Sequence, residues 1–231
     1  MHSFNVAGFA EYLVNPYLVG GAVATLWLTA SAIVIGFALG FALELMRRSR
    51  ITALAWIARA YVWLFRGTPL LVQLIVIYTG LPQFGVRIGV IESAVLGLSL
   101  NEAAYLAEII RAGFLAVSQG QVNAGKALGM TDSQVLRYVV APQAVRVIVP
   151  SLGNSVNGLL KTSSMASVIS MEELLRRTQE LIQEKFLVME LFTVAALYYL
   201  AMTTAWSYVQ RQIERRIGRP YDRLAETGEQ R

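Results

Sequence analysis

The sequence of 231 residues contains no cysteine, and its one histidine is His2. The lack of cysteine excludes disulfides, thiolate metal sites and cysteine nucleophiles. A single histidine beside the amino terminus argues against histidine-based metal or acid–base chemistry. The sequence also offers no nucleophile–base pair and no cluster of metal ligands, so we expect neither an enzyme nor a cofactor held by this chain.

Charge is scarce as well, at 15% of residues, against about 25% in ordinary soluble domains. Apolar residues make up 55% of the chain, and the mean hydropathy is +0.51. A helix needs about 20 apolar residues to cross a bilayer. The first sixteen residues hold no Lys or Arg, so no cleavable signal peptide is expected. We predict a single all-α integral membrane domain with about five transmembrane helices, at residues 17–45, 60–81, 91–114, 144–169 and 186–209.

Two of these spans carry local signals for packing or bending. Gly36 and Gly40 form a GxxxG pair, which either lets another helix approach closely or is only permissive spacing. The second apolar run is interrupted before Thr68 and Pro69, which predict a helix start with Thr68 as N-cap and Pro69 as first helical residue. A preceding helix over 52–65 would then begin near the membrane interface.

The basic residues indicate the orientation. With five spans, fifteen of the twenty Lys and Arg residues fall on one side of the membrane. The positive-inside rule makes that side cytoplasmic, so the N-terminus is outside and the C-terminus inside. The net charge of +5 then reflects topology and attraction to anionic lipid, and no nucleic-acid partner is expected. The basic tail, 210–231, contributes Arg211, Arg215, Arg216, Arg219, Arg223 and Arg231.

The longest strongly polar interval between the spans is 120–142, on the predicted cytoplasmic side. Gly129 ends a short helical pattern, as a left-handed residue after a helix does. Thr131, with a Gln three residues later, has capping-box spacing, so a second helix can start at Asp132. Pro142 limits how far the hydrogen-bond ladder of that helix runs unbroken. Two short helices joined by a glycine turn make a knob suited to docking, more than a merely solvated loop.

This interval resembles the cytoplasmic EAA loop of bacterial ABC-importer permeases, in which Glu-Ala-Ala is followed at fixed spacing by Gly, an apolar residue and Pro. The matching residues here are Asn123, Ala124, Gly125, Gly129, Val139 and Pro142. The flanking motifs look like the polar amino acid permease family: RGTPLLVQ at 66–73, AAYLAEIIRAG at 103–113, ALGM at 127–130 and PQAVRVIVPSLGN at 142–154. The resemblance covers roughly residues 17–209 and implies a type I ABC-importer permease fold.

The resemblance implies that residues 117–142 form a coupling loop, which fits a cleft in a separate ATPase subunit. The residues implied in coupling are Gly120, Gln121, Asn123, Ala124, Gly125, Ala127, Leu128, Gly129 and Met130. The sequence departs from the family at three positions. Asn123 stands in place of Glu, Gly125 in place of the second Ala, and Ser163 in place of the Asp of an LLKDTS-like motif.

Polar side chains within the third and fourth spans form a second group. A carboxylate facing lipid costs on the order of 2 to 3 kcal/mol, so we expect Glu102 to face the bundle interior or a water-filled path. It would either favour an ammonium or guanidinium group of a zwitterion, or pair with Lys161 or a neighbouring subunit for structure alone. Glu108 and Arg111 are expected to form a structural ion pair beside the knob. The substrate-path candidates are Asn101, Glu102, Tyr105, Lys161, Thr162, Ser163 and Ser164.

We therefore expect the membrane subunit of a polar amino acid ABC importer in the bacterial cytoplasmic (inner) membrane, working by alternating access. The implied partners are a second permease copy or a homologous permease, two ATPase subunits that hold ATP and Mg²⁺, an extracytoplasmic amino-acid-binding protein, and membrane lipid. A charged connector at 171–185 either meets that binding protein or lies on the membrane surface. The open alternatives are a related permease for another small solute, an ATPase-independent transporter or channel, and a non-transporting scaffold. The sequence does not indicate which amino acid is carried.

Overall fold

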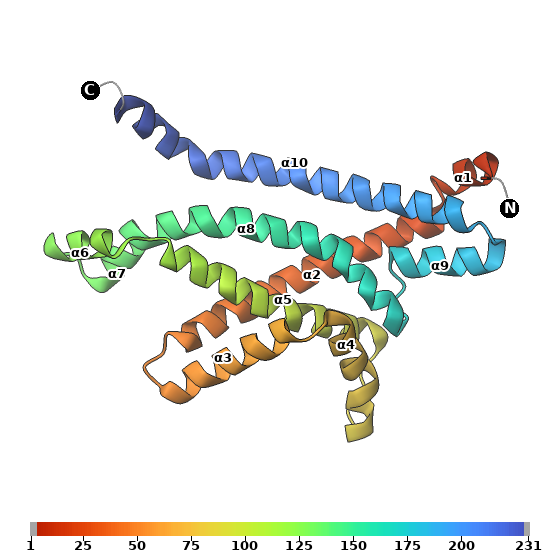
Figure 1. Ribbon diagram of the computed structural model, residues 1–231, viewed down its shortest axis with the longest axis horizontal. Coiled ribbons are helices and arrows are strands. Elements are labelled where there is room, and N and C mark those ends of the chain that lie inside the picture. Colours follow the sequence, from red (N-terminus) through yellow and green to blue (C-terminus); the bar gives the residue numbers. More distant parts are fainter. Residues whose placement is uncertain (1–3, 229–231) are drawn as a thin grey trace.

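The computed structural model describes the backbone of residues 4–228 and the side chains of residues 4–217. Within these residues the chain is helical apart from short connections and contains no strand, which confirms the predicted all-α class. Figure 1 labels the α-helices, and η denotes the 3-10 or π segments between them. The elements are α1 (Val6–Tyr12), α2 (Pro16–Arg47), α3 (Thr52–Gly67), α4 (Leu70–Ile75), η1 (Val76–Gly80), η2 (Leu81–Phe84), α5 (Val90–Leu115), α6 (Gln119–Ala127), α7 (Asp132–Val135), η3 (Leu136–Val140), α8 (Ala141–Thr162), η4 (Ser163–Ile169), α9 (Leu174–Lys185) and α10 (Val188–Gly228).

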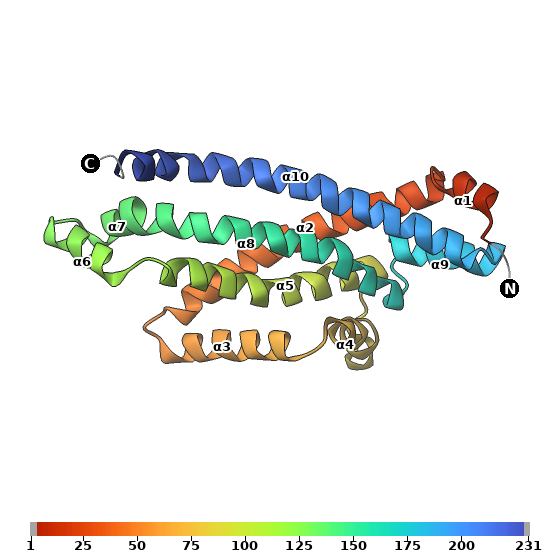
Figure 2. The same ribbon diagram turned by 45° about the horizontal axis from the view of Figure 1, so that its top comes forward.

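Helices α2 and α5 cross at the centre of the bundle, with α3 on one side and α8 and α10 on the other (Figures 1 and 2). Gly40 of α2 faces α5: a Cβ added to it would lie 2.9 Å from the carbonyl oxygen of Ala103 and 3.0 Å from the amide nitrogen of Ala107. A Cβ added to Gly36 would lie 3.3 Å from the carbonyl oxygen of Ser99, also on α5. The GxxxG pair is therefore a close backbone contact and not merely permissive spacing.

Among the described residues, four helical stretches are long and apolar enough to cross a membrane. A fifth candidate is the pair formed by α3 and the segment from α4 to η2, which is bent by 106° at its break. The spans predicted at 17–45, 91–114, 144–169 and 186–209 overlap the four unbroken stretches. Those stretches are Pro16–Arg47, Val90–Leu115, Asp132–Ile169 and Val188–Ile217.

The second predicted span, 60–81, is the bent one. Thr68 is the C-cap of α3, and its hydroxyl donates to the carbonyl of Leu64 at 2.9 Å. Pro69 precedes α4 with extended backbone, at ψ 136°. The prediction of Thr68 as N-cap and Pro69 as first helical residue is therefore wrong, because the Thr68 hydroxyl serves the helix before it. Beyond the bend, α4 continues into the π turn η1 and the 3-10 turn η2. This helical segment ends at Gly85, which has φ 83°.

The second helix of the knob continues into the fourth span. Pro142 lies in the first turn of α8, and the preceding residues, Leu136–Val140, form a π turn. Proline has no amide hydrogen to donate, and the side-chain amide of Gln143 donates to the carbonyl of Val139 at 2.8 Å. The predicted interruption of the ladder is present, but the knob is not two free short helices. Its second half opens a helix of 38 residues that ends at Ile169.

The last two helices, α9 and α10, meet at a tight turn. Phe186 ends α9 in a left-handed conformation, with φ 58°, so α10 starts at Val188. Helix α10 passes the predicted end of the fifth span and continues through Gly228. The predicted tail residues Arg219, Arg223 and Arg231 lie outside the described side chains, and so does His2.

Candidate functional site

The knob is closed by a defined turn. Met130 donates its amide hydrogen to the carbonyl of Gly125 at 3.1 Å, and Gly129 donates to Lys126 at 2.9 Å. With φ 80° at Gly129, these two bonds form a Schellman motif. Helix α7 then begins with the predicted capping box at Thr131. The two helix ends fix the internal geometry of the knob.

Most of the predicted coupling residues lie on the surface of the knob. Leu128 is its most exposed large apolar side chain, at 83%. Asn123, in the place of the family's Glu, accepts a hydrogen bond from Gln119 at 3.2 Å. Gly125 is buried against α7, where a Cβ would lie 3.3 Å from both Met130 Sδ and Val135 Cγ2, so a larger residue would crowd the turn. Met130 is half-buried, and the exposed members of the set are Gly120, Gln121, Asn123, Ala124, Ala127, Leu128 and Gly129.

A polar cavity of about 320 Å³ lies where α5, α8 and the α3–α4 bend meet. Four of the seven predicted path residues line it: Asn101, Glu102, Tyr105 and Thr162. The other three do not. Lys161 is exposed elsewhere on α8, whereas the hydroxyls of Ser163 and Ser164 donate to backbone carbonyls of their own turn.

Glu102 is the charged residue of this cavity. Its side chain is only 8% exposed, and its Oε1 atom has no hydrogen-bond partner. Ser155, a lining residue that the sequence did not suggest, lies beside the carboxyl group. Lys161 makes no ion pair with it among the described residues. A buried acceptor without a partner is costly, and a cationic group in the cavity would satisfy it.

Asn101 lines the cavity and is hydrogen-bonded to Gln73, another residue that sequence reasoning missed. Asn101 donates to the Gln73 side-chain oxygen at 2.9 Å and to the carbonyl of Phe65 at 3.3 Å. The Gln73 amide in turn donates to the carbonyls of Phe65 and Thr68, at 2.9 and 3.1 Å. These bonds satisfy carbonyls that the end of α3 leaves without a partner inside the helix. Asn101 therefore holds the 106° bend.

Glu108, six residues beyond Glu102 on α5, is surrounded by arginines. The predicted ion pair with Arg111 is present at 3.0 Å. Arg47 of α2 approaches to 2.5 Å, and Arg66 of α3 lies at 3.9 Å. One carboxylate thus joins three helices at the end of the bundle nearer the knob.

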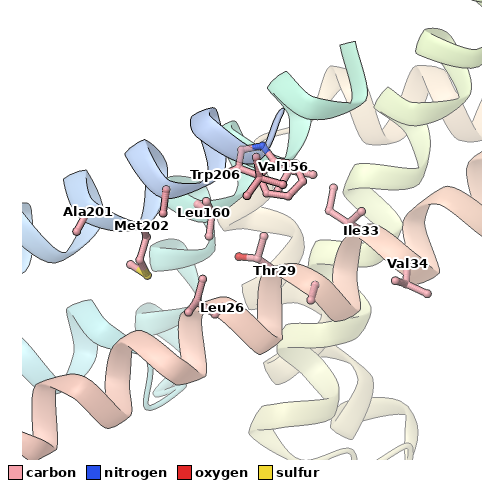
Figure 3. A pocket seen from close by; sticks show the side chains of 12 residues that line it. Leu26, Thr29, Ile33, Val34, Val156, Leu160, Ala201, Met202 and Trp206 are labelled. Carbon is pink, nitrogen blue, oxygen red and sulfur yellow. The ribbon is translucent and has the colours of Figure 1, made fainter. Parts of the chain in front are cut away.

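A larger cavity of about 720 Å³ lies between α2, α8 and α10 (Figure 3). Its lining is almost wholly apolar, as the labelled Leu26, Leu160 and Met202 illustrate. The indole N–H of Trp206 is already donated to the carbonyl of Gly153 at 2.8 Å. Such a cavity suits lipid chains or apolar side chains, so the smaller polar cavity is the candidate site for a polar solute.

Comparison with known proteins agrees with this architecture. Residues 32–219 match the family described as "Binding-protein-dependent transport system inner membrane component". The chain belongs to this family. Its members, by that description, are the inner-membrane components of transport systems that depend on a binding protein, so this chain is a membrane permease and not an enzyme.

Curated relatives and solved structures resemble the permease over most of its length. It is 40% identical to the L-cystine transport system permease protein TcyB of Bacillus subtilis (strain 168), over 88% of each chain. It is 36% identical to the glutamine transport system permease protein GlnP of Escherichia coli (strain K12), over 87% of this chain and 93% of the other. A crystal structure of an amino acid ABC transporter with histidines matches with a TM-score of 0.88 and 39% identity, over 93% of this chain and 100% of the other.

The connector helix α9 of the permease is anchored by a buried acid. Glu173, fully buried, accepts hydrogen bonds from the amide of Arg176 at 2.8 Å and from the hydroxyl of Tyr199 at 2.9 Å. Burial raises the pKa of Glu173, against the lowering effect of these hydrogen bonds. The charges predicted along the connector form local pairs, such as Arg176 with Glu180 at 2.8 Å. No group of acidic or histidine side chains suited to a metal ion occurs in the described part of the chain.

Proposed function

We propose that this permease imports polar amino acids, driven by ATP hydrolysis on a separate ATPase chain. One observation carries the proposal: the unpartnered carboxylate oxygen of Glu102 in a polar cavity large enough for an amino acid. An α-ammonium or a side-chain guanidinium would give that oxygen a charge-assisted hydrogen bond. The names of the relatives, which transport cystine and glutamine, support the same class of substrate.

Within the cavity, Glu102 would bind the cationic group, with Tyr105 and Thr162 contacting the rest of the solute. Asn101 would act as a positioning residue, because its amide is already used at the bend. Lys161 and its serine neighbours, which lie away from the cavity, have no role in this proposal. Alternating access would follow from binding the solute more tightly in one of two bundle arrangements.

Energy would enter through the knob, with its exposed residues in a cleft of a cytoplasmic ATPase subunit. The knob is suited to this role because its turn is fixed and because it is tied to the bundle. The side-chain amide of Gln143 on α8 donates to the side-chain oxygen of Gln121 on α6, and the ammonium of Lys126 lies 2.9 Å from Asp132 across the turn. We propose two ATPase subunits for a pair of permeases, from a second copy of this chain or a homologue.

We further propose that the N-terminus is outside and that the knob and the tail are cytoplasmic. The arginines Arg47, Arg48, Arg66 and Arg111 support this orientation, because they gather at the end of the bundle nearer the knob. An extracytoplasmic amino-acid-binding protein would then approach the opposite end, where α9 lies (Figure 1). Anionic lipid would meet the arginines at the cytoplasmic surface.

Reconstitution with the ATPase and the binding protein tests the proposal. We expect one or more of L-cystine, L-glutamine, L-arginine and L-histidine to stimulate ATP hydrolysis and to be taken up. Glu102→Gln should lower the affinity of the permease for the amino acid by roughly 10- to 100-fold, as expected when a hydrogen bond to a charged group is lost. Glu92→Gln, an exposed carboxylate on the same helix, is the control and should leave uptake unchanged.

Full uptake by Glu102→Gln would refute the role of the cavity. Uptake that does not need ATP would indicate a secondary transporter or channel. ATP-dependent uptake of a different class of solute would support the coupling to the ATPase and refute the proposed substrate class.

A further inference from the structure

Arg66 stands between the polar cavity and the Glu108 cluster. It is the second-to-last residue of α3, and Thr68, two residues later, lines the cavity. Its guanidinium carbon lies 5.5 Å from the centre of the Tyr105 ring, and Tyr105 lines the cavity too. The charged end of Arg66 therefore lies at the edge of the cavity, on the side toward the knob.

Arg66 is held more loosely than the other arginines at Glu108. Arg47 and Arg111 lie within hydrogen-bond distance of the carboxylate, at 2.5 and 3.0 Å. The nearest guanidinium nitrogen of Arg66 is 3.9 Å away, too far for a hydrogen bond, and its side chain is 45% exposed. Because Glu108 is already bonded by two arginines, it would stay paired if Arg66 left.

The described lining of the cavity includes no cationic group to pair with an anion. It includes one carboxylate, Glu102, and no Lys or Arg. An amino acid whose ammonium group reached Glu102 would therefore have its carboxylate without a cationic partner among the lining residues. Arg66 supplies a cationic side chain beside the lining, over the ring of Tyr105.

We infer that Arg66 binds the carboxylate of the transported amino acid as the solute leaves the cavity. The inference rests on the proposed function and names the second half of the same site. Glu102 and Glu108 are six residues apart on α5, a rise of about 9 Å. The guanidinium of Arg66 lies in the part of that interval between Tyr105 and Glu108. It can exchange its long contact with Glu108 for a bidentate pair with the carboxylate of the solute. The flat guanidinium stays over the Tyr105 ring during the exchange.

Equilibrium binding to the reconstituted complex tests this step. The ligands are the best-bound member of the panel of L-cystine, L-glutamine, L-arginine and L-histidine, and its α-carboxamide, which lacks the negative charge. Wild-type permease should prefer the acid over the amide by roughly 10-fold or more. Arg66→Gln should abolish that preference, because it lowers the affinity for the acid and leaves the affinity for the amide unchanged. Arg66→Lys should retain part of the preference. Arg59→Gln, an exposed arginine on the same helix, should keep the wild-type preference.

A second variant covers the case in which Arg66→Gln fails to assemble. Because the chain has no native cysteine, Arg66→Cys carries a single thiol, and disulfide attachment of an aminoethyl group should restore the preference where a neutral methyl group does not. An undiminished preference in the neutral variants, or an equal loss of acid and amide, would overturn the inference and leave a structural ion pair. Failure of wild-type permease to bind any amino acid would instead refute the proposed function.

Discussion

Replacing Gly129 separates backbone strain from steric contact in the knob. Gly129 has φ 80°, and a Cβ added to it would meet nothing within 4 Å. The space around the Cβ position therefore leaves the left-handed backbone as the main cost, about 1–2 kcal/mol for an ordinary L-residue. Asparagine adopts this conformation more readily. We expect the damage to rise in the order Asn, Ala, Val.

This cost acts on the Schellman turn that joins α6 to α7. A cost of 1 to 2 kcal/mol lowers the ratio of formed to unformed turn by a factor of about 5 to 30. Only a formed knob can fit a partner cleft, so the apparent affinity for the ATPase subunit falls with the population that remains formed. Binding of an amino acid to the cavity should stay unchanged, because Gly129 does not line it.

Uptake into proteoliposomes and co-purification with the ATPase subunit measure the effect of Gly129→Val. The matched control is Gly85→Val, which has the same strain, with φ 83° and nothing within 4 Å, in a loop outside the knob. Uptake and co-purification with the ATPase subunit should fall only in the Gly129 variant, with membrane insertion intact in both. Normal uptake by Gly129→Val, or equal losses in the two variants, would refute the coupling role of the knob.

Two further predictions concern stability. Gly40→Leu should lower the free energy of unfolding by about 1–3 kcal/mol, because its Cβ would lie 2.9 Å from a backbone oxygen of α5. Thermal unfolding in detergent measures this loss. The control is Gly67→Ala, whose Cβ would meet nothing within 4 Å and which should melt like wild type. The raised pKa of Glu173 means that its stabilising contribution is complete below the pKa of an unfolded carboxyl group and is lost as the pH rises through the folded value. Melting temperature plotted against pH should show this decline in wild type and in Glu184→Gln but not in Glu173→Gln, and identical curves for all three would contradict it.

The sequence was most informative where structure is set locally. Gly129 and the Thr131 capping box depend on neighbours within four residues, so their spacing was enough to predict both helix ends. The apolar runs likewise indicated the long helices. Glu102 was predicted to avoid lipid from its cost alone, and the structure buries it beside the cavity.

Features that depend on distant residues were missed or misassigned. Thr68 was predicted as an N-cap because the Thr-Pro pair is a common helix start, but the bend there is held by Gln73 and by Asn101, which lies 28 residues further along the chain. Ser155 and Lys161 lie on the same helix, and only the packing of α8 against α5 decides which of them reaches the cavity.

The helix that starts at the knob and ends at Ile169 can serve as a lever. Its 38 residues extend about 57 Å at 1.5 Å per residue. A tilt of about 10° at one end would therefore move the other end by about 10 Å. Its far end lies past Thr162, which lines the cavity, and stops at Ser170 in a left-handed conformation. A small rotation imposed on the knob would thus become a large displacement at the opposite surface of the membrane.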